Sequence, residues 1–154
     1  MPTDPSRTAD VRTALEDVAR LGPFFVLETP GPGDRDAWEP FRRLHTEPGP
    51  LGDRIAQVRT ALGADDRVAA SIAFQGLVAR LVAAPLAAVV LHGVLPETRG
   101  MSRRPDADDP WAPGLPDVTG TPSPDAARDP DGAAALVVDR LLDGLVAPLV
   151  EAVR

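Results

Sequence analysis

The sequence has 154 residues, and its 23 acidic and 16 basic residues give a formal net charge of −7. An acidic chain without a block of basic residues argues against a nucleic-acid-binding protein, because phosphate binding needs clustered positive charge, and it disfavours an anionic membrane surface. The chain contains no cysteine, which excludes a disulfide framework, a thiolate metal site and a cysteine nucleophile.

Length and composition predict one mainly α domain over residues 1–154, with an α+β fold left open. Hydrophobic residues make up 44% of the chain and aromatic residues only 4%, so we expect a core of Leu, Val and Ala, which suits close helix packing. The longest apolar run, 81–91, is interrupted by Pro85 and is too short to span a bilayer. The first residues lack a secretion signal. We therefore expect a cytoplasmic protein with no transmembrane segment.

The first part of the chain predicts a helix followed by one short strand. Thr8 is expected to cap this helix, whose apolar residues recur at helical spacing until Gly22-Pro23 ends it. The segment 24–27 is expected to be extended. After a Pro- and Gly-rich loop, a short helix is predicted over 38–45.

A second amphipathic helix is predicted over 51–62. Gly63 stands at its C-terminal cap position, where a left-handed backbone conformation commonly ends a helix. Arg54 and Arg59 are expected to face water.

The most apolar part of the chain predicts a buried central helix over 66–84, capped by Asp65 or Asp66. One side of this helix carries bulky residues, including Phe74, and Phe74→Ala is expected to cost about 3–5 kcal/mol. The other side carries very small residues. A helix that is apolar on both sides is expected to be buried. Pro85 is expected to start a separate helix that ends at Gly93.

The segment 96–132 is a long connection rich in Pro, Gly and Asp. A structureless loop of this length inside a compact domain is unusual, so extended pieces are expected near 101–104 and 111–115. Helical spacing returns over 133–154, and Pro148 is expected to kink that last helix.

Five residues stand out as candidates for binding. Ser71 and Gln75 lie at positions i and i+4 on one side of the central helix, where either a neighbouring helix or a ligand can satisfy them. Arg80 lies roughly opposite them, and both a snorkelling side chain and a pocket residue fit that position. Arg67 is expected to pair with Asp65 or Glu97, and Trp111 is either a core wedge or a groove residue.

The sequence predicts no catalytic residue and no metal-ligand set. The only histidines, His45 and His92, have no ligand partner at metal-site spacing. The aspartates of 106–109 and 125–131 lack the fixed ligand spacing of a Ca²⁺ loop. They are interpreted as solvated turns.

Several segments, read in order, resemble the N-terminal region of FhuF-like ferric-siderophore reductases. The central match is 66–81 (DRVAASIAFQGLVARL) followed by Pro85-Leu86-Ala87. The other matching segments are Leu21-Gly22-Pro23-Phe24-Phe25, Pro110-Trp111, Leu115-Pro116-Asp117 and Leu145-Val146-Ala147-Pro148-Leu149-Val150.

This resemblance implies a domain for ferric-siderophore binding or iron release. The residues carried over as substrate-binding are Arg67, Ser71, Gln75, Arg80 and Trp111. Members of the family are similar in having, after this region, a cysteine cluster that binds a [2Fe–2S] centre. A chain without cysteine cannot hold such a centre by itself, so we expect no cofactor in this chain and leave open whether it is an enzyme.

The alternative hypothesis is a non-catalytic helical interaction protein. Ala69, Gly76 and Ala83 lie on the small-residue side of the central helix, where another backbone can approach closely. That face predicts a homodimer or the docking of a partner helix.

Overall fold

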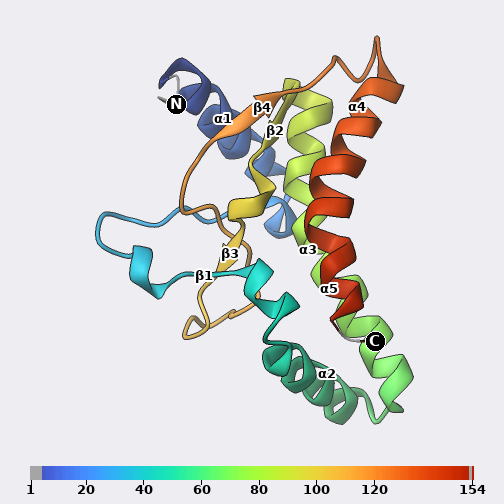
Figure 1. Ribbon diagram of the computed structural model, residues 1–154. Coiled ribbons are helices and arrows are strands. Elements are labelled where there is room, and N and C mark those ends of the chain that lie inside the picture. The colour runs from blue at the N-terminus through green and yellow to red at the C-terminus, as the bar shows by residue number, and fades with distance from the viewer. Residues whose placement is uncertain (1–4, 153) are drawn as a thin grey trace.

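A computed structural model describes residues 5–152 and residue 154 of the chain. It is mainly α, as predicted, and its short strands pair antiparallel (Figure 1). The α-helices are α1 (Pro5–Val18), α2 (Gly49–Leu62), α3 (Asp66–His92), α4 (Pro130–Val137) and α5 (Ala147–Glu151). The strands are β1 (Glu39–Pro40), β2 (Val94–Pro96), β3 (Ser102–Arg103) and β4 (Gly120–Pro122). Short 3₁₀ turns are η1 (Ala19–Leu21), η2 (Pro23–Phe25), η3 (Arg35–Ala37), η4 (Phe41–His45) and η5 (Thr98–Gly100).

Helix α3 is the longest element and contacts α1, α2 and η2. Asp65 caps it by accepting a hydrogen bond from the Val68 backbone N–H at 2.9 Å, and Gly93 ends it in the left-handed conformation at φ 61°. The expected break at Pro85 is wrong, because α3 continues through this proline to His92. Pro85 removes one backbone donor, but its ring lies buried on the core side of the helix.

Helix α3 buries one side only, so the expectation of burial all round is wrong. Leu77, Leu81, Ala84, Ala88 and Val89 face the core. The opposite side leaves large apolar side chains exposed, namely Val68, Ile72, Leu86 and Val90. By length and composition alone α3 is long and apolar enough to cross a membrane, a property shared by core helices of proteins that never do so. The absence of a transmembrane segment stays a prediction.

The central core gathers residues from all parts of the chain. Its largest fully buried side chains come from α1, η4, α3, the 96–132 connection and the C-terminal helices. They are Phe41, Leu81, Met101, Leu115, Leu141, Leu145, Leu149, Val11 and Val18. Leu, Val and Ala dominate the core cluster, as the composition predicts.

The C-terminal helix starts at Pro130, three residues before the predicted start, with Asp129 accepting from the Gly132 backbone N–H at 2.9 Å. Between α4 and α5 the helix widens to π geometry over η6 (Val138–Val146). This widened segment ends just before Pro148, the residue predicted to disturb the helix. Leu141 and Leu145 of this segment are buried in the core.

Two expectations near the N-terminus differ from the structure. Helix α1 begins at Pro5, so Thr8 lies inside it and is not its cap. The predicted strand over 24–27 is wrong, because Pro23 starts a 3₁₀ turn instead. The chain becomes extended only beyond this turn, where Glu28 bridges Gly114.

The connection 96–132 is extended near both predicted places, at β3 and at the bridging residue Gly114, and it holds a further strand, β4, that was not predicted. Strand β3 pairs with β1, and β2 pairs with β4. Gly114 bridges both Glu28 and Ser102, and a Cβ atom there would collide with the Trp38 ring and lie 2.7 Å from the Glu28 carbonyl oxygen. This close packing fixes the path of the chain around Trp111.

Candidate functional site

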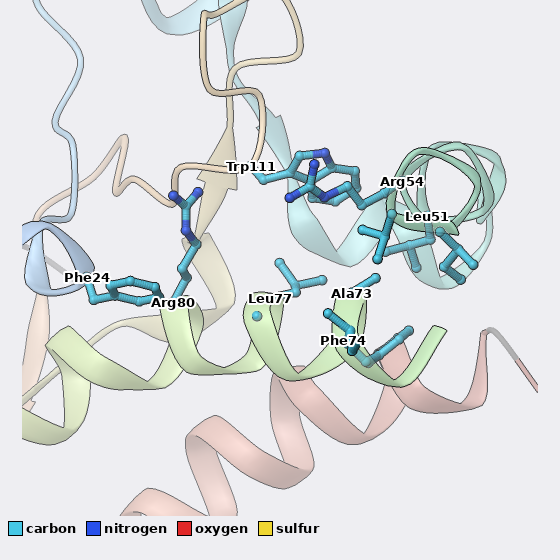
Figure 2. Close-up of a pocket in the computed structure, with 12 residues that line it drawn as sticks. Phe24, Leu51, Arg54, Ala73, Phe74, Leu77, Arg80 and Trp111 are labelled. Carbon is cyan, nitrogen blue, oxygen red and sulfur yellow. The ribbon is translucent and has the colours of Figure 1, made fainter. Parts of the chain in front are cut away.

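A pocket of about 290 Å³ lies between α2, α3, η2 and the 105–111 loop. Most of the residues that line the pocket are apolar, and two are arginines. Figure 2 shows the lining side chains converging on the pocket. The lining residues that matter most here are Phe24, Arg54, Leu77, Arg80 and Trp111. A mostly apolar pocket with a few convergent polar groups is typical of small-molecule sites.

Trp111 forms one wall of the pocket, and contacts with Arg103 and Asp109 hold it in place. The Arg103 guanidinium lies 4.7 Å from the centre of the Trp111 ring, a cation–π contact. The Trp111 backbone N–H donates to Asp109 Oδ1 at 3.1 Å. Because Trp111 is only 8% exposed, its position is set by these neighbours and not by solvent.

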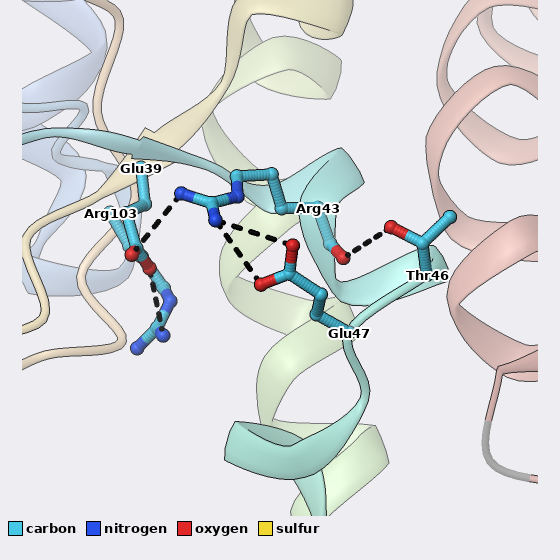
Figure 3. Close-up of polar contacts among 5 residues, drawn as sticks. All are labelled: Glu39, Arg43, Thr46, Glu47 and Arg103. Carbon is cyan, nitrogen blue, oxygen red and sulfur yellow. Dashed lines mark hydrogen bonds and ion pairs between the residues drawn. The ribbon is translucent and has the colours of Figure 1, made fainter.

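Arg103 is itself fixed by a carboxylate network (Figure 3). Its Nη2 donates to Glu39 Oε2 at 3.3 Å, and its Nη1 donates to the Pro110 carbonyl at 3.4 Å. Arg43 lies 3.6 Å from the other Glu39 oxygen and 3.2 Å from Glu47. Glu39 thus holds the buried Arg103 against Trp111.

Arg80 forms the opposite side of the pocket. Its Nη1 donates to Asp109 Oδ2 at 2.6 Å, and its guanidinium lies 5.7 Å from the centre of the Phe24 ring. Partial burial by itself raises the pKa of Asp109, but hydrogen bonds from Arg80 and the Trp111 backbone, with the charges of Arg80 and Arg54, outweigh it and lower this pKa below 3.8. Asp109 therefore stays ionised and orients Arg80.

This lowered pKa predicts a pH-dependent contribution to stability. A carboxyl whose pKa is lower in the folded state stabilises the fold fully above its unfolded pKa, and the contribution disappears as the pH falls through the folded value. Asp109→Asn should therefore lower the free energy of unfolding at pH 7, and the difference from wild type should shrink below pH 3.8. Urea unfolding at pH 7 and below pH 3.8 measures this difference in the free energy of unfolding. Asp108→Asn is the control for removing one charge from the same loop. A difference that stays constant with pH would contradict the assignment.

Arg54 belongs to the pocket although the sequence placed it simply on the water-facing side of its helix. It is exposed, but it extends from α2 toward Trp111 (Figure 2), and its charge reaches Asp109. Arg59, on the same helix, pairs with Asp66 at 3.0 Å outside the pocket. Helical periodicity separates core from surface, but it does not tell which surface position borders a cavity.

Of the five predicted binding residues, the structure brings only Arg80 and Trp111 to this pocket. Ser71 and Gln75 are exposed and contact each other, Nε2 to Oγ, at 3.4 Å. Arg67 is exposed as well. The spacing of 100° per residue places these three on the other side of α3 from Arg80.

The prediction that Arg67 pairs with Asp65 or Glu97 is wrong. Among the residues that the structure describes, neither carboxylate forms an ion pair with it. Asp65 is used as the helix cap, and Glu97 accepts the Arg99 backbone N–H at 3.0 Å. His92 contacts Asp17 at 2.9 Å, while the Nε2 atom of His45 is buried without a hydrogen-bond partner in the described part of the chain.

The side chains do not fit the iron–sulfur centre of the family that the sequence resembles. The chain has no cysteine, and over residues 5–152 no three His, Asp or Glu side chains gather as metal ligands do. Cluster ligation needs such a set of side chains. No step through a cluster is therefore assigned to this chain.

Comparisons with known proteins leave the family open. No family model, no curated protein and no solved structure matches this chain. The FhuF-like resemblance therefore stays a prediction, and the chemistry of the pocket has to carry any functional argument.

Proposed function

We propose that this domain binds a ferric siderophore or a similar oxygen-rich anionic complex in the pocket between α2, α3 and Trp111. One observation carries the proposal: residues from three separate segments meet around one cavity. Phe24, Arg80 and Trp111 lie far apart in the sequence, and all three line the pocket. Each comes from one of the segments that resemble the siderophore reductases.

The charges favour an anionic ligand. Arg54 and Arg80 contribute two positive charges and Asp109 removes one, so the pocket keeps an excess of positive charge in a chain whose net charge is −7. Arg54 forms no ion pair with the acidic residues that the structure describes. Guanidinium groups recognise oxygen anions through paired N–H donors, and Arg80 is already oriented by Asp109.

The aromatic rings favour a ligand with extended apolar or π surfaces. Phe24 is half exposed at one end of the pocket, whereas Trp111 is almost fully buried at the other. A ferric tris-catecholate complex is anionic and presents flat chelating rings around Fe³⁺, so the aromatic side chains can pack against it while the arginines face the oxygen atoms. The iron here is part of the ligand and is not a resident cofactor.

Self-association through the small-residue face of α3 has less support. Ala69 is fully buried, and Gly76 lines the pocket. Ala69, Gly76 and Ala83 therefore do not form one accessible seam. A homodimer or a partner helix elsewhere on the surface stays a prediction, as does the cytoplasmic location.

Tryptophan fluorescence tests the proposal because the two tryptophans, Trp38 and Trp111, are the only ones in the chain. In Trp38→Phe, which keeps Trp111, a negatively charged ferric tris-catecholate should quench the emission in a saturable way. The Ga³⁺ complex should compete for the same site without redox chemistry. Trp111→Phe, which keeps Trp38, should show only the non-saturable absorption of light by the complex.

Two arginines of α2 provide a matched pair of variants. Arg54→Gln should weaken binding by about tenfold or more, the value of one hydrogen bond to a charged group. Arg59→Gln changes the same helix and the same charge outside the pocket and should leave affinity unchanged. No saturable quenching, or equal losses in both variants, would rule out this pocket as the siderophore site.

A further inference from the structure

A second pocket, of about 440 Å³, lies on another part of the surface, formed by η3, β1, η4, η5 and β3. It shares no residue with the pocket of Trp111. Three arginines line it, one from each of the three short 3₁₀ turns: Arg35, Arg42 and Arg99. A backbone hydrogen bond connects η4 to the residue that follows η5, because the Phe41 N–H donates to the Met101 carbonyl at 3.0 Å.

The carboxylates near this pocket leave it positively charged. Arg35 pairs with Asp117, which also lines the pocket. Among the described residues, neither Arg42 nor Arg99 pairs with a carboxylate side chain. Glu97 accepts the Arg99 backbone N–H but does not line the pocket. Three arginines and one aspartate give the lining an excess of two positive charges.

The neighbouring Arg43, unlike Arg42, has carboxylate partners. On the same turn as Arg42, it is engaged by Glu39 and Glu47 at 3.6 and 3.2 Å (Figure 3). Other exposed arginines that the structure describes are paired in the same way, among them Arg20, Arg59 and Arg140. Gathering Arg42 and Arg99 around one pocket without a partner costs electrostatic repulsion, and a bound anion would remove that cost.

Trp38 supplies the wall of this second pocket. It is 9% exposed, its indole Nε1 is buried without a hydrogen-bond partner among the described residues, and the Arg104 guanidinium lies 5.4 Å from its ring centre. Gly114 packs against its far edge. These contacts hold the Trp38 ring in place, and Arg104, which pairs with Glu28 at 2.8 Å, adds no excess positive charge to the site.

We propose that this second pocket binds the phosphate group of a small molecule, held between Arg42 and Arg99. A phosphate dianion matches the excess of two positive charges, and its tetrahedral oxygens accept paired N–H donors from guanidinium groups. The acidic character of the rest of the chain repels a nucleic-acid backbone. The ligand is therefore a small phosphate compound or free phosphate.

The experiment uses Trp111→Phe, in which Trp38 is the only tryptophan and reports on this pocket alone. At constant ionic strength, inorganic phosphate, pyrophosphate and glycerol phosphate are titrated, with acetate as a singly charged control. Saturable changes in Trp38 emission with all three phosphates indicate recognition of the phosphate group itself, and a response to glycerol phosphate alone indicates a phosphate monoester. Acetate should produce no saturable change.

Substitution of the two unpaired arginines decides the assignment. Arg42→Gln with Arg99→Gln should weaken phosphate binding by about tenfold or more. Both side chains are exposed, so circular dichroism should show an unchanged fold. Arg128→Gln, which removes an exposed arginine paired only with Asp125, should leave affinity unchanged. No saturable response to any phosphate, or equal affinity in the double variant, would overturn the proposal.

Discussion

Phe41→Ala should lower the free energy of unfolding by about 3–5 kcal/mol, the range for removing a buried Phe side chain. Phe41 is 0% exposed. It lies in η4, which packs against α5 and joins the Met101 backbone. The cavity left by alanine would therefore lie between the C-terminal helix and the 96–132 connection.

Phe74→Ala is the matched comparison for this prediction. Phe74 is only partly buried and borders the Trp111 pocket, so its loss should cost less than about 2 kcal/mol, part of the value of full burial. The cost of about 3–5 kcal/mol expected from the sequence assumed a fully buried Phe and is corrected by this exposure. Urea unfolding of both variants measures the difference, provided that the slope of the transition is unchanged. A larger cost for Phe74→Ala would mean that α3 is buried on both sides after all.

Glu39→Ala should destabilise the protein more than Arg103→Met, although both remove the same ion pair. Arg103 is 6% exposed, and without Glu39 its charge stays buried with only the Pro110 carbonyl and the Trp111 ring beside it. Removing one partner of a buried ion pair typically costs about 3–5 kcal/mol. Because the Glu39 side chain is 39% exposed, we expect about 3 kcal/mol, the low end of this range.

Arg103→Met should change stability by less than about 1.5 kcal/mol, because an apolar side chain of similar volume avoids burying a charge. Glu39 then keeps Arg43 at 3.6 Å and is partly solvated. Thermal and urea unfolding measure both variants, and Trp111 emission shows whether the indole keeps its place. Equal losses in the two variants would mean that Arg103 is not desolvated in the native state.

The candidate site could be predicted only in part. The sequence predicts Arg80 and Trp111 as binding candidates, and both line the pocket. Ser71 and Gln75 were selected on the expectation that α3 is buried all round, and this expectation fails because the chain packs neighbours on one side of that helix only. Arg54 and Phe24 carried no local signal, since nothing in their own segments indicates which cavity they border.

The sequence by itself determined the local features that depend on short-range chemistry. Asp65 and Gly63 cap their helices as predicted, because side-chain capping and left-handed glycine conformations involve residues only a few positions apart. The mainly α fold and its Leu, Val and Ala core follow from composition and spacing. Tertiary structure alone decided that α3 runs through Pro85, because burial of that proline on the core side is a long-range effect. It also decided the long-range ion pairs, because Arg35–Asp117, Arg80–Asp109 and Arg103–Glu39 join residues distant in sequence.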